Sequence, residues 1–406
     1  MVTLLTAAPA ADRIEALLHQ PLSIYIHIPF CRVRCTYCAF NTYAGMSDLI
    51  PEFVTALCTE IEGVGRAAPS GITSHTLYLG GGTPSLLTPG QVRRIVDSAR
   101  QSFFLTSDAE ITLEANPGTV TLDSLQAYRE AGINRLSIGI QSAHEADLKL
   151  FGRRHSFEEA EAAFFLARQA AFESISIDLI YGAPYQTLSA WQRTLDTVLR
   201  WKPEHIAVYS LILEPGTSLA LQVTRGHVPD PDSDLAADMY DLARERLAHE
   251  GFLHYEISNW GQPGHQSRHN RQYWLNQPYL GFGPGAHGCA LGYRYWNINP
   301  VPEYIARLGN GVTQPFPFSP ALADSEFIDQ PTEMDESIFL GLRLLSEGVN
   351  KEAFFSRFGL HIEDRYHKPL KRLIAQDLLI DDGAALRLPA SAALISNYVF
   401  RKLLDV

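Results

Sequence analysis

Short apolar runs alternate with longer segments of helical periodicity through the first half of the chain. Six of these runs are rich in β-branched and aromatic residues, which suits buried strands. They are Leu22–Ile28, His75–Leu79, Glu110–Ala115, Arg135–Ile140, Ser174–Tyr181 and His205–Leu213. The alternation predicts repeated βα units around a parallel sheet. Periodicity alone leaves open whether these units form an open doubly wound sheet or an incomplete barrel.

Two helix starts can be identified between the predicted strands. Thr88 followed by Pro89 is a helix N-cap with proline at the first helical position. Ser156 and Glu159 form a capping box, which predicts a helix that continues through Ala171. Both signals fall between strands, as βα units require.

The pattern changes beyond residue 250. Residues 251–300 are less regular and dense in Tyr, Trp, His and Gly, so we expect them to cover the open mouth of the sheet. From Thr332 onward amphipathic helices are predicted, and Phe339, Leu342, Leu344 and Leu345 lie near one stripe. These changes predict four segments: an extension at 1–20, the βα units at 21–250, an aromatic-rich covering region at 251–330, and a helical domain at 331–406.

The last segment has the element order of a winged helix. A helix is predicted over Pro369–Asp377, then a hairpin in which 379–383 turns into 385–388, then a final helix. Winged helices often bind DNA, but the basic residues here are few. A packing or docking role is therefore favoured, and no site is assigned to this domain.

Composition limits the classes of protein that the chain can belong to. With 406 residues, 46% hydrophobic and 19% charged, it is predicted to be globular with two or three domains. A net charge of -12 disfavours nucleic acid as a partner. The N-terminus lacks the basic start of a signal peptide, and no apolar run approaches the length of a membrane span. Five cysteines without a disulfide framework fit a reducing compartment, so we expect a cytoplasmic protein.

Three of the five cysteines form a CxxxCxxC motif directly after the first predicted strand. They are Cys31, Cys35 and Cys38, whereas Cys58 and Cys289 stand alone. Three thiolates on one short loop suit a 4Fe-4S cluster, whose fourth iron would remain open to a small molecule. The alternatives are a zinc site or a chance trio. Zinc sites usually take four ligands from two separated pairs, and no second pair exists here.

Polar and glycine residues follow the other predicted strands at the corresponding end. Ligands of parallel α/β folds bind at the carboxyl ends of the strands, so these residues are expected to converge. They are the runs Gly80–Pro84 and Glu114–Pro117, Gln141 and, late in its strand, Asp178. The glycine run is neither a phosphate loop nor a dinucleotide fingerprint, and by itself it favours an ordinary turn.

Together the cysteine and glycine motifs resemble those of the radical S-adenosylmethionine (SAM) superfamily. The resemblance implies a partial TIM-like barrel of six βα units, with SAM bound to the open iron. More closely, the chain is similar to the oxygen-independent coproporphyrinogen III dehydrogenases and their heme-chaperone relatives. The matching runs are Tyr25–Cys31, Tyr78–Ser85, Glu114–Pro117, Ser137–Ser142, Gly152–His155 and Ile177–Gly182.

The resemblance also implies the residues that contact SAM. They are Tyr25, Tyr37, Gly81, Gly82, Thr83, Glu114, Gln141, Arg153 and Asp178. The carboxylates can accept hydrogen bonds from ribose or amino groups, and Arg153 can pair with the methionine carboxylate. For each polar residue, a structural hydrogen bond at the barrel mouth is the alternative role.

A second motif separates the chaperones from the dehydrogenases. The dehydrogenases extend the cysteine motif to CxxxCxxCxC and carry a longer arm before it, whereas here Cys38 is followed by Ala39 and Phe40. The segment that begins at His269 resembles the HNxxYW motif of the HemW heme chaperones. Its candidate heme-binding residues are His269, Asn270, Tyr273 and Trp274. His can ligate iron and aromatic rings can stack on a macrocycle, but packing of these residues is the alternative.

The resemblance therefore implies a heme chaperone that carries a 4Fe-4S cluster and a SAM site. Its partners would be heme and acceptor hemoproteins, including respiratory hemoproteins met at the membrane surface. A coproporphyrinogen III oxidase, acting by radical oxidative decarboxylation, is the alternative, and a radical enzyme that opens or methylates heme is a third. His287 is a weaker candidate iron ligand than His269, and a homodimer remains open.

Overall fold

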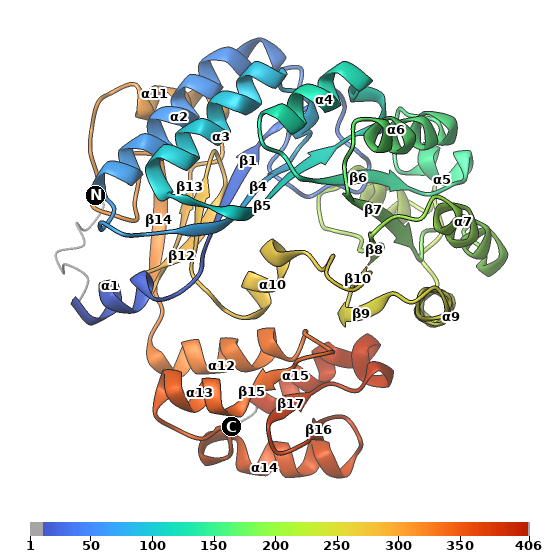
Figure 1. The fold of residues 1–406 in the computed structure, drawn as a ribbon. Coiled ribbons are helices and arrows are strands. Elements are labelled where there is room, and N and C mark those ends of the chain that lie inside the picture. Colours follow the sequence, from blue (N-terminus) through green and yellow to red (C-terminus); the bar gives the residue numbers. More distant parts are fainter. Residues whose placement is uncertain (1–10, 405–406) are drawn as a thin grey trace. The chain divides into compact units, whose positions relative to one another are not determined.

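The computed structural model describes residues 11–404 and divides into two compact units. Unit 1 comprises the described residues up to Ile138 together with Glu159–Glu173 and Gln277–Ile328. Unit 2 comprises Gly139–Glu158, Ser174–Asn276 and the described residues from Asp329 onward. Figure 1 shows the chain coloured from its N-terminus to its C-terminus. Both units are of α/β type, and each draws on more than one stretch of sequence.

The unit 1 sheet contains the first four predicted strands, which are parallel. They are, in spatial order, β1 (Leu22–Ile28), β4 (Ser74–Gly81), β5 (Leu105–Ala115) and β6 (Arg135–Gln141), of which the part up to Ile138 belongs to unit 1. In β1, Ile24, Ile26 and Ile28 are fully buried and alternate with Tyr25 and His27, so the two faces of the strand differ. The prediction of β1 is confirmed with the same bounds, and the other three strands are longer than predicted.

Four further strands continue this sheet on the other side of β1. They are β11 (Tyr279–Phe282), β12 (His287–Ala290), β13 (Tyr293–Asn297) and β14 (Leu322–Phe327). β11 pairs parallel with β1, and the next three strands are antiparallel. Most of residues 279–297 thus form regular strands, where the sequence led us to expect less regular structure. Strands of four or five residues give too little alternation to stand out from their aromatic and glycine-rich surroundings.

The unit 1 helices include α2 and α3, which pack against each other over β1, β4 and β5 (Figure 1). The bounds are α1 (Ala11–Leu18), α2 (Ile50–Ala67), α3 (Pro89–Phe103), α4 (Leu122–Glu130), α6 (Phe157–Gln169), most of which lies in unit 1, and α11 (Val301–Leu308). Thr88 caps α3 as predicted and forms a capping box with Gln91. α6 starts after Ser156 as predicted but ends at Gln169, because Ala171 takes a left-handed φ of 63°.

A buried carboxylate joins α2 to the added strands of unit 1. Glu60 is 1% exposed and accepts four hydrogen bonds. The donors are Gly283 N (2.9 Å), Asn297 Nδ2 (2.7 Å), Tyr304 Oη (2.5 Å) and Ser319 Oγ (2.6 Å). Burial raises the pKa of Glu60, and the four donors act in the opposite direction. This residue holds four separate segments to one point of α2.

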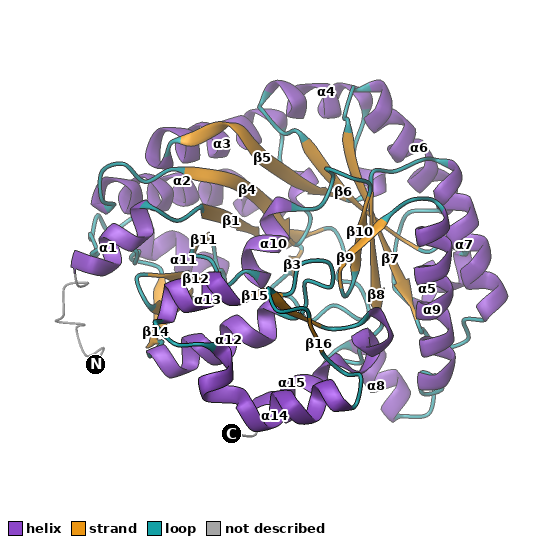
Figure 2. Cartoon of the chain, turned by 60° about the horizontal axis from the view of Figure 1, so that its bottom comes forward, coloured by secondary structure: helices purple, strands orange, loops and turns teal. Residues whose placement is uncertain are grey.

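Unit 2 contains two parallel strands, β7 (Ser174–Tyr181) and β8 (His205–Ser210), followed by the antiparallel β10 (Asn259–Gly261) and β9 (Leu253–Glu256). β7 has the predicted bounds, and β8 ends three residues before the predicted Leu213. The helices are α5 (Glu145–Leu150), α7 (Leu188–Arg200), α8 (Ser218–Thr224), α9 (Ser233–His249) and α10 (Arg268–Trp274). α7 and α9 pack side by side (Figure 2).

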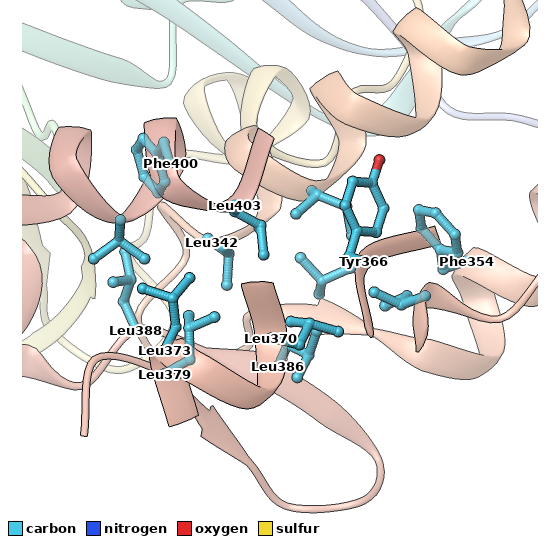
Figure 3. Packing of buried hydrophobic residues seen from close by; sticks show 14 of the residues in the cluster. Leu342, Phe354, Tyr366, Leu370, Leu373, Leu379, Leu386, Leu388, Phe400 and Leu403 are labelled. Atoms are coloured by element: carbon cyan, nitrogen blue, oxygen red, sulfur yellow. The ribbon is translucent and has the colours of Figure 1, made fainter. Parts of the chain in front are cut away.

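The C-terminal part of unit 2 combines helices with a small sheet in the strand order β15-β17-β16. The elements are α12 (Gln330–Gly341), β15 (Val349–Asn350), α13 (Lys351–Phe358), α14 (Ile362–Ala375), β16 (Ile380–Asp381), β17 (Ala385–Arg387) and α15 (Ser396–Leu404). β16 and β17 confirm the predicted hairpin. Apolar side chains from α12, α13, α14 and α15 share one core (Figure 3).

Two predicted helices of this part have different bounds in the structure. α12 ends at Gly341, so Leu342, Leu344 and Leu345 follow the helix instead of continuing its stripe, although Leu342 and Leu344 are fully buried. The helix predicted to start at Pro369 starts at Ile362, and Pro369 lies inside it. A kink at Tyr366 (φ -111°, ψ 18°) accommodates the proline, which cannot donate a helical hydrogen bond.

Some predictions concern residues or boundaries that the structure does not test. Residues 1–10, on which the argument against a signal peptide rests, lie outside the described residues. The four-segment division also remains a prediction. Among residues 11–404, no helix is both long enough and apolar enough to cross a membrane.

Candidate functional site

The cysteine motif lies on a loop between β1 and α2. A short parallel pair, β2 (Phe30–Cys31) and β3 (Tyr43–Ala44), closes the base of this loop. All three thiols are half-buried and none forms a disulfide. Cys38 Sγ lies 3.9 Å from Thr42 Oγ1. The loop therefore holds three thiols within one short, locally paired segment.

Asn41 ties the cysteine loop to the added strands of the sheet. Its side-chain amide donates to the carbonyl oxygens of Pro284 (3.0 Å) and Asn299 (3.2 Å). Its own carbonyl oxygen accepts from His27 Nε2 (2.9 Å), which places the ring proton on Nε2 and leaves Nδ1 to accept from Tyr25 Oη (3.0 Å). Burial lowers the pKa of His27, so its ring is neutral at pH 7.

Three thiols on one short loop are a donor set that suits a 4Fe-4S cluster. Among residues 11–404, no three His, Cys, Asp or Glu side chains converge closely enough to hold one metal ion. A cubane does not need such convergence, because each thiolate binds a different iron. Thr83 Oγ1 donates to Cys31 Sγ at 3.6 Å, which links the glycine loop to the first cysteine of the motif.

The glycine loop after β4 is fastened to the start of the cysteine loop. Gly82 N donates to Ile28 O and Thr83 N donates to Phe30 O, both at 2.8 Å. A Cβ atom on Gly82 would lie 2.7 Å from Phe30 O, so this close approach requires glycine. The two motifs, which are about 50 residues apart in sequence, therefore form one local structure.

Glu114 supports the same loop from the neighbouring strand. Its carboxylate accepts from Tyr78 Oη (2.8 Å) and from Gly81 N (3.0 Å). Tyr25 stacks on Tyr78 with ring centres 6.2 Å apart, and burial, with a further contribution from Glu114, raises the pKa of the Tyr25 phenol. The structure thus brings together Cys31, Gly81, Thr83, Glu114 and Tyr25. Tyr37 is half-buried on the cysteine loop.

Three of the candidate SAM residues belong to unit 2. Arg153 Nη2 donates to Gly139 O at 2.7 Å. A side chain on Gly139 would meet Gln141 Nε2 at 2.8 Å and Arg153 Nη2 at 3.2 Å, so this glycine allows the two polar side chains to approach each other. Gln141 is buried and has a left-handed φ of 72°. Asp178 is half-buried in the middle of β7, not at its end.

The HNxxYW motif forms α10, which is capped by Ser267. His269 is 1% exposed, and its Nε2 lies 2.9 Å from Tyr273 Oη, with the two rings edge to face. Asn270 and Trp274 are half-buried, and the Arg343 guanidinium lies 4.2 Å from the centre of the Trp274 ring. In this conformation His269 has the packed role that the sequence left as the alternative.

Several residues next to these motifs were not predicted. Tyr78 positions Glu114, His27 orients Tyr25, and Asn41 anchors the cysteine loop. The position of His27 two residues after Tyr25 places both on one face of β1, a signal available in the sequence. No pattern in the sequence marks Asn41, because its partners lie more than 240 residues away.

His287 occupies a different environment from His269. It is exposed on β12 and stacks on Trp296 of β13, with ring centres 5.7 Å apart and planes 26° from parallel. Partial burial, with a further contribution from Arg294, lowers the pKa of His287. The imidazole is therefore neutral near pH 7, the form that offers a nitrogen lone pair.

Comparison with known proteins identifies relatives over nearly the whole chain. Residues 25–198 match the radical SAM superfamily model, and residues 328–395 match the HemN C-terminal domain model. The heme chaperone HemW of Bacillus subtilis (strain 168) is 36% identical over 380 residues, which cover 93% of this chain and 98% of that protein. HemW of Lactococcus lactis subsp. lactis (strain IL1403) is 34% identical over 388 residues, covering 96% and 98%.

A solved structure shares the fold. Coproporphyrinogen III oxidase (HemN) from Escherichia coli, described as a radical SAM enzyme, superposes with a TM-score of 0.82. The match covers 97% of this chain and 92% of that one at 24% sequence identity. At this level of identity the likeness concerns the fold alone.

Proposed function

Because this chain belongs to the HemW family of heme chaperones within the radical SAM superfamily, we propose that it binds heme and transfers it to acceptor hemoproteins. The observation that carries the proposal is the similarity to HemW proteins over almost the full length of both chains. The cysteine loop, the glycine loop and α10 all fall within the aligned length. The proposed acceptors include membrane respiratory proteins.

We further propose that Cys31, Cys35 and Cys38 bind a 4Fe-4S cluster and that SAM binds beside it. The superfamily match implies both groups. When bound and reduced, such a cluster can cleave SAM to a radical. The chain's own contribution is to hold the glycine loop against the cysteine loop and to keep Glu114 on the backbone of Gly81. Tyr25, Tyr37, Gly82, Thr83, Gln141, Arg153 and Asp178 complete the proposed set of SAM contacts.

We also propose a specific fold for each part of the chain. Six parallel βα units of the radical SAM type would form a partial barrel, and the C-terminal helices with their three-stranded sheet would form a winged-helix-like domain. Support comes from the parallel pairing within each unit and from the HemN C-terminal match to residues 328–395. The shared fold with HemN agrees with this assignment.

An assay of heme transfer and porphyrin turnover on the same preparation tests the proposed function. Anaerobically reconstituted protein is titrated with heme and then mixed with an apo-hemoprotein. In parallel it is incubated with coproporphyrinogen III, reductant and SAM. We expect heme binding, transfer to the acceptor and no protoporphyrinogen. Formation of protoporphyrinogen would favour the oxidase, and failure to bind heme would overturn the chaperone function.

The residues of α10 give a more specific expectation. His269→Ala is expected to lower heme affinity about tenfold, because it removes the proposed iron ligand of the motif, while the cluster absorbance stays unchanged. Tyr273→Phe is the matched variant, since it removes only the hydroxyl that lies 2.9 Å from His269 Nε2. If His269 is an iron ligand, the loss of this hydroxyl frees its imidazole, and Tyr273→Phe should bind heme at least as tightly as the wild type. Equal losses in both variants would show that His269 serves packing instead.

A further inference from the structure

One face of the sheet in unit 1 carries side chains suited to an iron porphyrin. We call it the β12 face and define it by Tyr279, His287, Cys289, Arg294 and Trp296. His287 pairs across strands with Trp296, Cys289 pairs with Arg294, and Tyr279 pairs with Cys289. Residues paired across strands point to the same side of a sheet, and so do residues two apart along one strand. All five side chains therefore project from one face of β11, β12 and β13.

The opposite face of these strands faces α2. Asn297, next to Trp296 on β13, donates to the buried Glu60 of α2. Tyr295, on the other side of Trp296, is 2% exposed. Alternation thus turns Trp296 and its partners away from α2. The exposure of His287 on β12, and of Asp324 and Glu326 on the neighbouring β14, agrees with this orientation.

Ring-bearing side chains line up across this face, and a glycine occupies one position in the line. Tyr25 pairs with Gly281 across β1 and β11, and the backbone of His287 lies opposite Gly281 on β12. A Cβ on Gly281 would lie 1.9 Å from His287 O, so no larger residue fits there. The line therefore runs from Tyr25 through a bare glycine to the stacked pair of His287 and Trp296.

We propose that His287 is an axial iron ligand for heme bound on the β12 face. The proposal rests on the proposed heme chaperone function and names a ligand for it. The imidazole is exposed and braced by Trp296, the aromatic rings offer a flat apolar surface, and Arg294 can pair with a propionate. Coordination forms one Fe–N bond and requires no electron or group transfer.

The two histidines differ in what must happen before they can bind iron. His269 is 1% exposed and its Nε2 is engaged with Tyr273, so it has to be uncovered first. His287 needs no such rearrangement. Heme iron has two axial positions, so the assignment of His287 to one of them does not require a second protein ligand. The exposed histidine is the one ready to receive free heme.

Heme titrations of purified full-length variants test this assignment. His287→Ala is expected to weaken heme binding about tenfold or more and to remove the spectral signature of one nitrogen ligand. Added imidazole should restore that signature. Arg294→Gln should weaken binding while leaving the iron ligand spectrum unchanged, because it touches only the propionate. His249→Ala, an exposed histidine of α9, is the matched control and should behave as the wild type.

The outcomes separate this inference from the function on which it rests. If the wild type binds heme and His287→Ala keeps both affinity and spectrum, the assignment of His287 is wrong and the chaperone function stands. If the wild type itself binds no heme, the proposed function fails. Because His287 is exposed, the variants should fold normally, and their thermal melting curves verify this before titration.

Discussion

Replacing Cys35 with serine is expected to reduce the iron and sulfide content of the reconstituted protein to background while leaving it folded. Cys35 lies in the middle of the loop, outside the β2–β3 pair, and its backbone oxygen accepts from Cys38 N. Serine preserves the size of the side chain, but its hydroxyl is a poor ligand for iron. The measurement is iron and sulfide analysis together with the visible absorbance of the cluster.

Cys58→Ala provides the matched control for this experiment. Cys58 is 2% exposed in α2, and burial raises the pKa of its thiol, so it remains protonated and unsuited to bind metal. The control should retain the full cluster. Stoichiometric zinc in the wild type, or an unchanged cluster in Cys35→Ser, would show that the loop does not hold a three-thiolate 4Fe-4S site.

Replacing Glu60 with leucine is expected to lower the free energy of unfolding by about 3–5 kcal/mol. The substitution leaves Gly283 N, Asn297 Nδ2 and two hydroxyl groups without their shared buried acceptor. A loss of this size is a large fraction of the stability of a typical domain. Urea unfolding measures it, and Glu52→Leu, an exposed position on the same helix, should change little.

Glu60→Gln keeps the shape of the side chain and tests the protonation state. Burial raises the folded-state pKa of Glu60 above its unfolded value of about 4.5, so the folded protein holds this proton more tightly. The stability that this proton contributes is present below about pH 4.5 and is lost as the pH rises through the folded-state pKa. As the pH rises from about 4.5 through the folded-state pKa, the free energy of unfolding of the wild type should therefore fall relative to that of Glu60→Gln. A difference that stays constant with pH would contradict the raised pKa.

Long regular patterns made much of the α/β core predictable. The seven residues of β1 and the eight of β7 alternate or run apolar without interruption, and both strands have the predicted bounds. β12 and β13 were missed because four or five residues, separated by a two-residue turn, give too short a signal. Their placement beside β11 depends on pairing with β1, which lies more than 250 residues earlier in the chain.

The candidate site was predictable at the level of motifs but not of contacts. CxxxCxxC and the glycine run identify which loops matter, yet only the fold shows that Glu114 holds the Gly81 backbone. The packing of His269 against Tyr273 had a usable signal, because residues four apart on a helix are neighbours. The exposure of His287 had none, since it depends on which face α2 covers.

The hydrogen bonds of Asn41 connect the loop of the proposed cluster to the strands of the proposed heme site. Its amide bonds to Pro284 and Asn299, which flank β12 and β13, while its backbone ends the cysteine loop. If heme on the β12 face shifts these anchors, heme affinity and the redox equilibrium of the cluster become linked, and the two effects must be equal in size. Cargo would then be held or released according to the electron supply of the cell, with no SAM consumed.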